Sequence, residues 1–266
     1  MYEKVENIIS KIGTGATDPL DCLVNNKRAI VKTYNNDEGN KVLANEIIAY
    51  NIAKMMNMPI PQCGICVIDK YTEDIEGIID SSKFGIGFYS KRLDKVTPII
   101  NNPMLLEKYV KNKSIFLNII IFDHIIYNKD RHKGNLLLSS IEKQNHKLFI
   151  IDHSHIFNIG ALWDEYQLKR MISQDNFRST EIMEYNYGTY EILLNVINVT
   201  KDNIVNTANE MIRNINFSEL QKVINTLPTE WGITKNEKIL LYEYIINRIN
   251  NIDIICDTIY QYVKSR

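Results

Sequence analysis

The sequence predicts an α+β fold with two lobes: a small, β-rich lobe over residues 1–93 and a larger, mostly helical lobe over residues 94–266. Within the first of these ranges, apolar side chains alternate with polar ones, which is typical of half-buried strands. From residue 103 onward the apolar spacing is mostly helical. No repeat, low-complexity segment or linker divides the chain, so we expect residues 1–266 to form a single domain.

The composition is that of an ordinary globular protein, with 45% hydrophobic and 24% charged residues. With 31 basic and 32 acidic residues the net charge is −1, so nothing favours direct nucleic-acid binding. The N-terminus is charged where a signal peptide needs an apolar core. The longest apolar run, residues 115–126, is shorter than the ~20 residues that span a bilayer. We therefore expect a cytoplasmic protein without a membrane span.

The elements of the first lobe follow from its apolar pattern. Residues 28–34 alternate as a strand does, and the polar residues 35–39 form the turn that ends it. Residues 40–56 then show helical spacing, and Pro59 and Pro61 stop that helix. Further strands are expected at residues 65–69, 75–79 and 84–89.

The second lobe begins with a helix at residues 114–127 that is apolar nearly all round, which predicts burial at the centre of the lobe. Residues 136–138 and 148–151 form a hairpin with Asn135 and Asp152 at its outer ends. In an antiparallel pair those two ends lie side by side. Amphipathic helices follow at residues 164–174, 179–195, 202–215, 217–226, 235–251 and 253–264.

The most informative motif joins Asp130 to Asn135 five positions later, with Asp152 at the end of the next apolar strand. This arrangement is how kinase-type phosphotransferases supply a proton acceptor and two metal ligands. Asp130 would orient and deprotonate a hydroxyl group. The amide oxygen of Asn135 and the carboxylate of Asp152 are hard ligands suited to the Mg²⁺ that accompanies ATP.

Lys32 ends the strand segment Ala29-Ile30-Val31-Lys32, which resembles the kinase strand that carries the ATP-binding lysine. A lysine facing a cleft neutralises the phosphates as a point charge. Glu46, on the following helix, is its expected partner, since it is a polar exception among apolar neighbours. Taken alone, a strand lysine is more often simply solvated.

Gly13, Thr14, Gly15 and Ala16 form a second candidate phosphate contact, because small residues let backbone N–H groups approach phosphate oxygens. The alternative is a flexible turn, since the segment lacks the full glycine-rich consensus. His132 also has two interpretations: it donates to a phosphate, or it holds the shape of the catalytic loop.

These motifs together resemble the HipA-like kinases in their short, stand-alone form. The resemblance covers most of the chain: the Gly13–Ala16 loop, Lys32 with Glu46, the segments 128–135 and 151–157, and a Pro-Thr-Glu-Trp element at 228–231. It implies a two-lobed, protein-kinase-like fold that uses ATP and Mg²⁺ to phosphorylate a Ser or Thr hydroxyl. Lys32 would then bind phosphate, Asp130 act as base, and Asn135 and Asp152 hold the metal.

Two departures from the family limit what the resemblance implies. The sequence does not show the extra N-terminal region of full-length HipA toxins, so we do not expect toxin–antitoxin pairing or complexes on DNA. Asp152-His153-Ser154 stands where many kinases have Asp-Phe-Gly, so activation-loop regulation is not expected either.

The phosphoryl acceptor remains open, because acceptor choice depends on the surface of the helical lobe. The first hypothesis is a protein Ser/Thr kinase that also phosphorylates itself. A second is a small-molecule or lipid kinase, since the motifs also resemble type II phosphatidylinositol 4-kinases more loosely. A third is a nucleotide-binding regulator with little turnover, against which stands the presence of every polar catalytic position.

Overall fold

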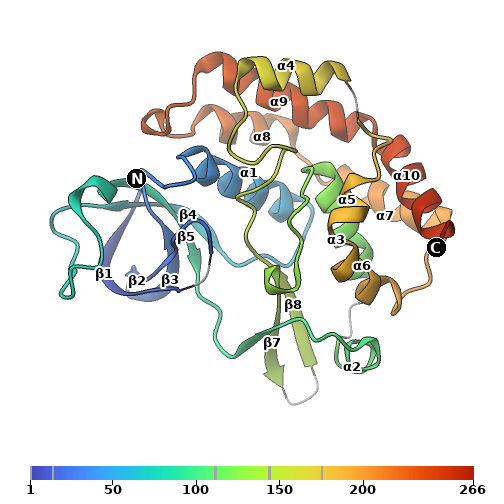
Figure 1. Cartoon of the computed structure of the whole chain (residues 1–266), viewed down its shortest axis with the longest axis horizontal. Coiled ribbons are helices and arrows are strands. Elements are labelled where there is room, and N and C mark those ends of the chain that lie inside the picture. The colour runs from blue at the N-terminus through green and yellow to red at the C-terminus, as the bar shows by residue number, and fades with distance from the viewer. Residues whose placement is uncertain (1, 14, 111–112, 143–144, 175) are drawn as a thin grey trace.

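The computed structural model describes residues 2–13, 15–110, 113–142, 145–174 and 176–266. Its N-terminal part is a closed β-barrel, followed by a helical remainder (Figure 1). The barrel order is β1-β2-β3-β5-β4. Its strands are β1 (Glu3–Lys11), β2 (Leu20–Val24), β3 (Lys27–Lys32), β4 (Cys63–Ile68) and β5 (Gly85–Lys91).

The barrel closes around its own apolar core because alternate side chains of each strand point inward. In β3, Ala29 and Val31 are buried while Arg28 is exposed. Asn25 and Asn26 both have positive φ (50° and 57°), as a two-residue hairpin turn between β2 and β3 requires. The buried core residues are Val5, Ile8, Leu20, Cys22, Val24, Ala29, Val31, Cys66 and Ile68.

The strand expected at residues 75–79 is wrong, because this segment is a loop. The carboxylate of Asp74 accepts hydrogen bonds from the backbone N–H groups of Ile78 (2.9 Å) and Ile79 (3.1 Å). A side chain that bonds its neighbours in this way offers the backbone an alternative to a strand ladder. Ile75 is consequently 82% exposed instead of packed.

Helix α1 (Lys41–Met55) lies between the barrel and the helices of the C-terminal part (Figure 1). Gly39 has a φ of +85° in the turn that precedes the helix, and Asn57, with a φ of 56°, follows its end. The helix is buried on nearly all sides, since it packs on β4 and β5 on one side and on α8 on the other. It corresponds closely to the helix expected at residues 40–56.

A second sheet links the barrel to the helices. It has the order β6-β7-β8 and consists of β6 (Val96–Pro98), β7 (Leu136–Glu142) and β8 (Asn145–Ile150). Helix α2 (Pro103–Tyr109) and helix α3 (Ser114–Ile125) lie between β6 and β7 in the sequence. The expected β7–β8 hairpin is present, with Leu136 opposite Ile150, and it projects from the body of the molecule (Figure 1).

The C-terminal helices complete the fold, and several of them pack against α3, which is buried along almost its whole length, as expected from its apolar surface. They are α4 (Glu165–Gln174), α5 (Glu181–Tyr185), α6 (Tyr187–Leu194), α7 (Lys201–Arg213), α8 (Phe217–Asn225), α9 (Lys235–Asn250) and α10 (Ile252–Lys264). The one helix expected at 179–195 is divided between α5 and α6 at Asn186. The buried Asn186 amide bonds the Arg131 N–H and the Asn128 carbonyl.

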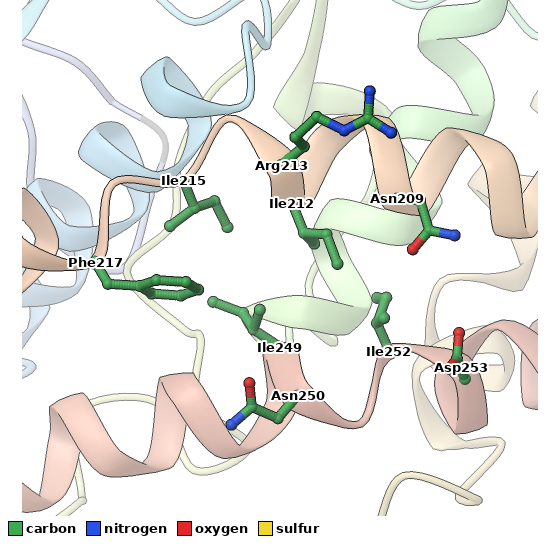
Figure 2. Close-up of a pocket in the computed structure, with 9 residues that line it drawn as sticks. All are labelled: Asn209, Ile212, Arg213, Ile215, Phe217, Ile249, Asn250, Ile252 and Asp253. Atoms are coloured by element: carbon green, nitrogen blue, oxygen red, sulfur yellow. The ribbon is translucent and has the colours of Figure 1, made fainter.

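Where α7, α9 and α10 meet, the surface has an open hollow of about 610 Å³ (Figure 2). Isoleucine and asparagine side chains form much of its lining, and none of the motif residues of the sequence lies there. Among the helices that the structure describes, none is long and apolar enough to cross a membrane.

Candidate active site

A cleft of about 570 Å³ lies between the barrel and the segments that flank the β7–β8 hairpin. Its polar lining contains most of the predicted site residues, namely Gly15, Lys32, Glu46, His132, Asn135 and Asp152. Its apolar lining comes from both parts of the chain and includes Ile30, Ile60, Phe88, Leu137 and Ile151. The hollow in Figure 2 has a similar volume but lacks such a set of chemical groups.

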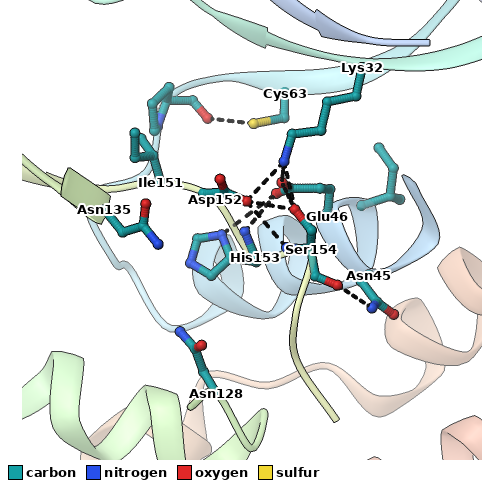
Figure 3. Close-up of polar contacts among 12 residues, drawn as sticks. Lys32, Asn45, Glu46, Cys63, Asn128, Asn135, Ile151, Asp152, His153 and Ser154 are labelled. Atoms are coloured by element: carbon teal, nitrogen blue, oxygen red, sulfur yellow. Dashed lines mark hydrogen bonds and ion pairs between the residues drawn. The ribbon is translucent and has the colours of Figure 1, made fainter. Parts of the chain in front are cut away.

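The centre of the cleft is an ion cluster around Lys32, at the end of β3 (Figure 3). Its Nζ lies 2.5 Å from Glu46 Oε1 and 2.9 Å from Asp152 Oδ1. It also donates to the hydroxyl of Ser154 at 2.7 Å. The ion pair expected between Lys32 and Glu46 is therefore present, and both side chains are almost fully buried.

These groups hold one another in their charged forms. Burial alone would lower the pKa of Lys32, but Glu46 and Asp152 outweigh it and raise that pKa. Burial alone would raise the pKa of each carboxyl group, but the Lys32 ammonium outweighs it and lowers both. At neutral pH the cluster therefore has one positive and two negative charges, which favours binding of a further cation.

Asn135, just before β7, and Asp152, just after β8, lie at the same end of the hairpin and line the same cleft, as expected from the sequence. The backbone N–H of Ile151 donates to the Asn135 carbonyl at 3.1 Å, which extends the β7–β8 pairing to these ends. Figure 3 shows the two side chains on the same side of the site. Asp152 has a φ of 56°, an uncommon conformation for a residue other than glycine that clusters at functional sites.

The oxygen atoms that face the cleft remain available. Asp152 Oδ1 is occupied by Lys32 and by Ser154, whose hydroxyl lies 2.6 Å away. Within the described residues, Asp152 Oδ2 accepts no hydrogen bond, and neither does the amide oxygen of Asn135. The Asn135 amide nitrogen donates to the Asp130 carbonyl at 2.8 Å, which fixes the orientation of the amide.

Asp130 lies on the loop after α3 and is not itself part of the cleft lining, although His132 and Asn135 of the same loop are. Its N–H donates to Asn128 Oδ1 at 2.9 Å and its carbonyl accepts from Asn135, so its backbone is held on both sides. Its carboxylate is 47% exposed. Nearby, His132 is exposed, and its Nδ1 accepts from the Gly134 N–H at 3.0 Å. This bond fits the interpretation that His132 shapes the loop.

A buried polar network beneath the loop fixes its position. Arg131 and Asp123 form an ion pair at 2.8 Å with both side chains fully buried. Arg131 also donates to the carbonyls of Asn135 and Ile151. Burial lowers the pKa of His153, so its neutral ring accepts from the Arg131 guanidinium at 3.0 Å. Arg131 therefore links the loop of Asp130 to the segment of Asp152.

The predicted phosphate loop is only partly at the cleft. Gly15, with a φ of 124°, lines it, whereas Gly13 and Ala16 are exposed and are not part of the lining. Thr14 lies outside the described residues. The loop connects β1 to β2. The first strand expected from the sequence, at residues 28–34, corresponds to β3, so β1 and β2 are two earlier strands that the apolar pattern did not reveal.

Sequence reasoning missed Ser154, Arg131 and Asp123 as parts of the site. A signal existed for Asp123, since it interrupts the longest apolar run of the chain, and a charge in such a run needs a buried partner. Ser154 stands two positions after Asp152, but no spacing rule marks a serine there as a partner of Lys32.

Comparisons with known proteins concern the family and the fold of the chain. The sequence model of the HipA-like kinases matches residues 5–257. The structure is similar to the Helicobacter pylori proinflammatory kinase CtkA, with a TM-score of 0.63, 13% sequence identity and 100% of each chain covered. At that identity the similarity shows the fold alone.

A weaker similarity is found to HipA in a toxin–antitoxin complex with HipB and operator DNA from Shewanella oneidensis MR-1. It has a TM-score of 0.48 and 13% identity over 95% of this chain and 67% of that one, which is too low to support an argument. No curated protein matches the chain. Since the family match spans nearly the whole sequence, the chain belongs to the HipA-like kinase family.

Proposed function

We propose that this chain is an ATP- and Mg²⁺-dependent Ser/Thr protein kinase built as one two-lobed domain, with the cleft between residues 1–93 and 94–266. The observation that carries the proposal is the buried Lys32–Glu46 pair beside Asp152, in the cleft that Asn135 also lines. A buried lysine that pairs with a glutamate, beside an aspartate that keeps one oxygen free, is the arrangement that kinases use to bind a triphosphate and its metal.

The nucleotide would occupy the cleft with its base among the apolar side chains and its phosphates at Lys32. Ile30 and Phe88 of the barrel face this space together with Leu137 and Ile151 of the other lobe. Gly15 reaches the same cleft, where its N–H would approach a phosphate oxygen.

The residues present fit a magnesium ion. Asn135 and Asp152 offer one free oxygen each, and among the described residues no cluster of three His, Cys, Asp or Glu groups forms a closed metal site. Mg²⁺ is commonly bound by one or two carboxylates or amides together with waters and phosphate oxygens. When bound, it would neutralise charge that develops on the phosphates.

Asp130 would act on the acceptor. The acceptor hydroxyl oxygen forms a bond to the γ-phosphorus, the bond from that phosphorus to the β,γ-bridging oxygen breaks, and ADP leaves. The hydroxyl proton passes to the Asp130 carboxylate. The Asp130 side chain is 47% exposed on the loop that also supplies His132 and Asn135 to the cleft, which suits the side chain of a protein acceptor, including one from another copy of this chain.

Incubation with Mg-ATP followed by intact-mass measurement tests the proposal. We expect the wild type to gain mass in multiples of one phosphoryl group, and Asp130→Ala to gain none. Asp202→Ala, which removes an exposed carboxylate on α7, is the matched control and should behave like the wild type. Wild type without a mass gain, or equal gains in wild type and Asp130→Ala, would contradict the proposal.

A further inference from the structure

His155 lies between the proposed catalytic base and a carboxylate of the first lobe. Its Nδ1 is 3.8 Å from Asp130 Oδ2, and its Nε2 is 3.3 Å from Glu38 Oε2. The second contact is a long hydrogen bond, whereas the first is beyond hydrogen-bond distance and is an electrostatic attraction when the ring carries both protons. Each nitrogen of this ring therefore lies near a carboxylate oxygen, and the two carboxylates come from the two parts of the chain that form the cleft.

The Asp130 carboxylate has no other partner in the described part of the chain. Its backbone is fixed by Asn128 and Asn135, but those bonds leave rotation of the side chain free. The other basic groups nearby are engaged elsewhere: Lys32 with Glu46 and Asp152, and Arg131 with Asp123. Among the described residues, His155 is the only basic group that lies within 4.0 Å of this carboxylate.

The segments that carry Glu38 and His155 are each fixed by hydrogen bonds to neighbouring parts of the chain. On the first-lobe side, the Asn36 side chain accepts from the Glu38 N–H at 3.1 Å and donates to the Thr17 carbonyl at 2.9 Å. This ties the loop of Glu38 to the loop that carries Gly15.

On the other side, the residues before and after His155 are anchored. The Ser154 carbonyl accepts from the Asn45 amide at 2.6 Å, and the Phe157 N–H donates to the Ile126 carbonyl at 2.9 Å. Gly160, with a φ of 63°, lies beside the His155 ring, so that a Cβ there would be in ordinary van der Waals contact with the ring at 3.4 Å. The backbone on both sides of His155 is therefore fixed, while the ring itself is 37% exposed and has Glu38 as its hydrogen-bond partner.

We propose that His155 is a positioning residue that aims the Asp130 carboxylate at the acceptor hydroxyl and is itself held by Glu38. The inference rests on the proposed kinase function. It adds a link between the base and the first-lobe loop at residues 35–40, so that the orientation of the Asp130 carboxylate depends on the position of that loop. Loss of the link leaves ATP binding intact and slows transfer, because a reacting group misplaced by 1 Å can cost about 100-fold in rate.

The test is the initial rate of ADP release from Mg-ATP together with the KM for ATP, measured for His155→Ala, His155→Asn, His155→Gln and Glu38→Gln. An asparagine amide lies near the place of Nδ1 and faces Asp130, whereas a glutamine amide reaches only the place of Nε2. His146→Gln, on β8 outside the cleft, is the control for replacing a histidine. Thermal unfolding confirms that each variant is folded, and Glu38→Gln probes the link should His155→Ala fail to fold.

We expect kcat to fall about 10- to 100-fold in His155→Ala, with the KM for ATP within about twofold of wild type. The kcat of His155→Asn should be at least about threefold higher than that of the alanine variant, whereas the kcat of His155→Gln should not be. In Glu38→Gln, kcat should fall less than in His155→Ala. An active wild type whose kcat is unaffected in His155→Ala and Glu38→Gln overturns this inference alone, as does a loss expressed in KM. A wild type that releases no ADP overturns the proposed function as well.

Discussion

The two oxygens of the Asp152 carboxylate have different surroundings and different proposed roles. One of its oxygens is bonded to Lys32 and Ser154, and the other is free on the cleft side. Under the proposed function, the first oxygen keeps the lysine in place and the second takes the metal. The low pKa of the carboxyl group, which the Lys32 ammonium sustains against burial, keeps it ionised for both tasks.

We therefore predict that Asp152→Asn removes the magnesium dependence of ATP binding. An amide keeps the shape but loses the charge that attracts Mg²⁺, and even loss of an outer partner typically costs about 10- to 100-fold in metal affinity. Calorimetric titration with ATP, with and without Mg²⁺, measures the effect. If Mg²⁺ increases the affinity for ATP equally in the variant and the wild type, the metal assignment is wrong.

At this scale the sequence predicted part of the site. Lys32, Glu46, Asn135 and Asp152 could be assigned because each stands at the end of a strand or on a helix face, where spacing fixes direction. Ser154 and His155 stand in an irregular segment, where no periodicity shows which way a side chain points. Two of their partners, Lys32 and Glu38, lie more than a hundred positions away in the sequence and meet them only in the folded chain.

Among the elements, α1 matters most for the site because it carries Glu46. It is held from the barrel side and from the C-terminal side. Lys41 at its start pairs with Glu237 of α9 at 2.7 Å, and α8 packs along it. Trp231, just before α9, donates its indole N–H to the Ile86 carbonyl of β5 at 2.8 Å. The C-terminal helices thus hold α1 against the barrel, in the position where Glu46 meets Lys32.

Trp231→Phe should destabilise the protein by about 1–3 kcal/mol, since the buried Ile86 carbonyl loses its donor while most of the aromatic volume stays. Urea unfolding gives this free energy. Tyr166→Phe, at a side chain that is 70% exposed, serves as the control and should change stability by less than about 0.5 kcal/mol. The same small change in both variants would show that the contact contributes nothing.

The elements themselves were predictable where their pattern is long and regular. The helices α1, α4, α8 and α9 begin and end within one or two residues of their expected bounds. Strand β1 was missed because register shifts on either side of Asn7 break its alternation. The segment at 75–79 was mistaken for a strand because its isoleucines suggest one, although the Asp74 carboxylate bonds the backbone that a strand would need.

For the molecule as a whole, the helical core contains an acid-sensitive group. His124 lies in the last turn of the buried helix α3, and burial lowers its pKa to about 4. Its Nδ1 bonds the Ile120 carbonyl at 2.9 Å, and its Nε2 has no partner among the described residues. An unfolded histidine titrates near ~6.5, so below that pH the unfolded chain binds a proton that the folded chain refuses.

His124 therefore contributes stability above pH ~6.5 that is lost as the pH falls toward about 4. When the pH falls from 7 to 5, the free energy of unfolding of the wild type should decrease by roughly 2 kcal/mol more than that of His124→Gln. Urea unfolding of both proteins at the two pH values measures this difference, and all other titrating groups cancel in the comparison. Parallel losses in the two proteins would show that His124 does not set the acid sensitivity.

The most direct test of the central claim is a crystal structure of the chain with Mg²⁺ and a non-hydrolysable ATP analogue. We predict that the triphosphate lies against Lys32, that the metal contacts the free oxygens of Asn135 and Asp152, and that Asp130 faces the γ-phosphate. A nucleotide bound outside this cleft, or one bound inside it with Asn135 and Asp152 turned away from the metal, would contradict the account.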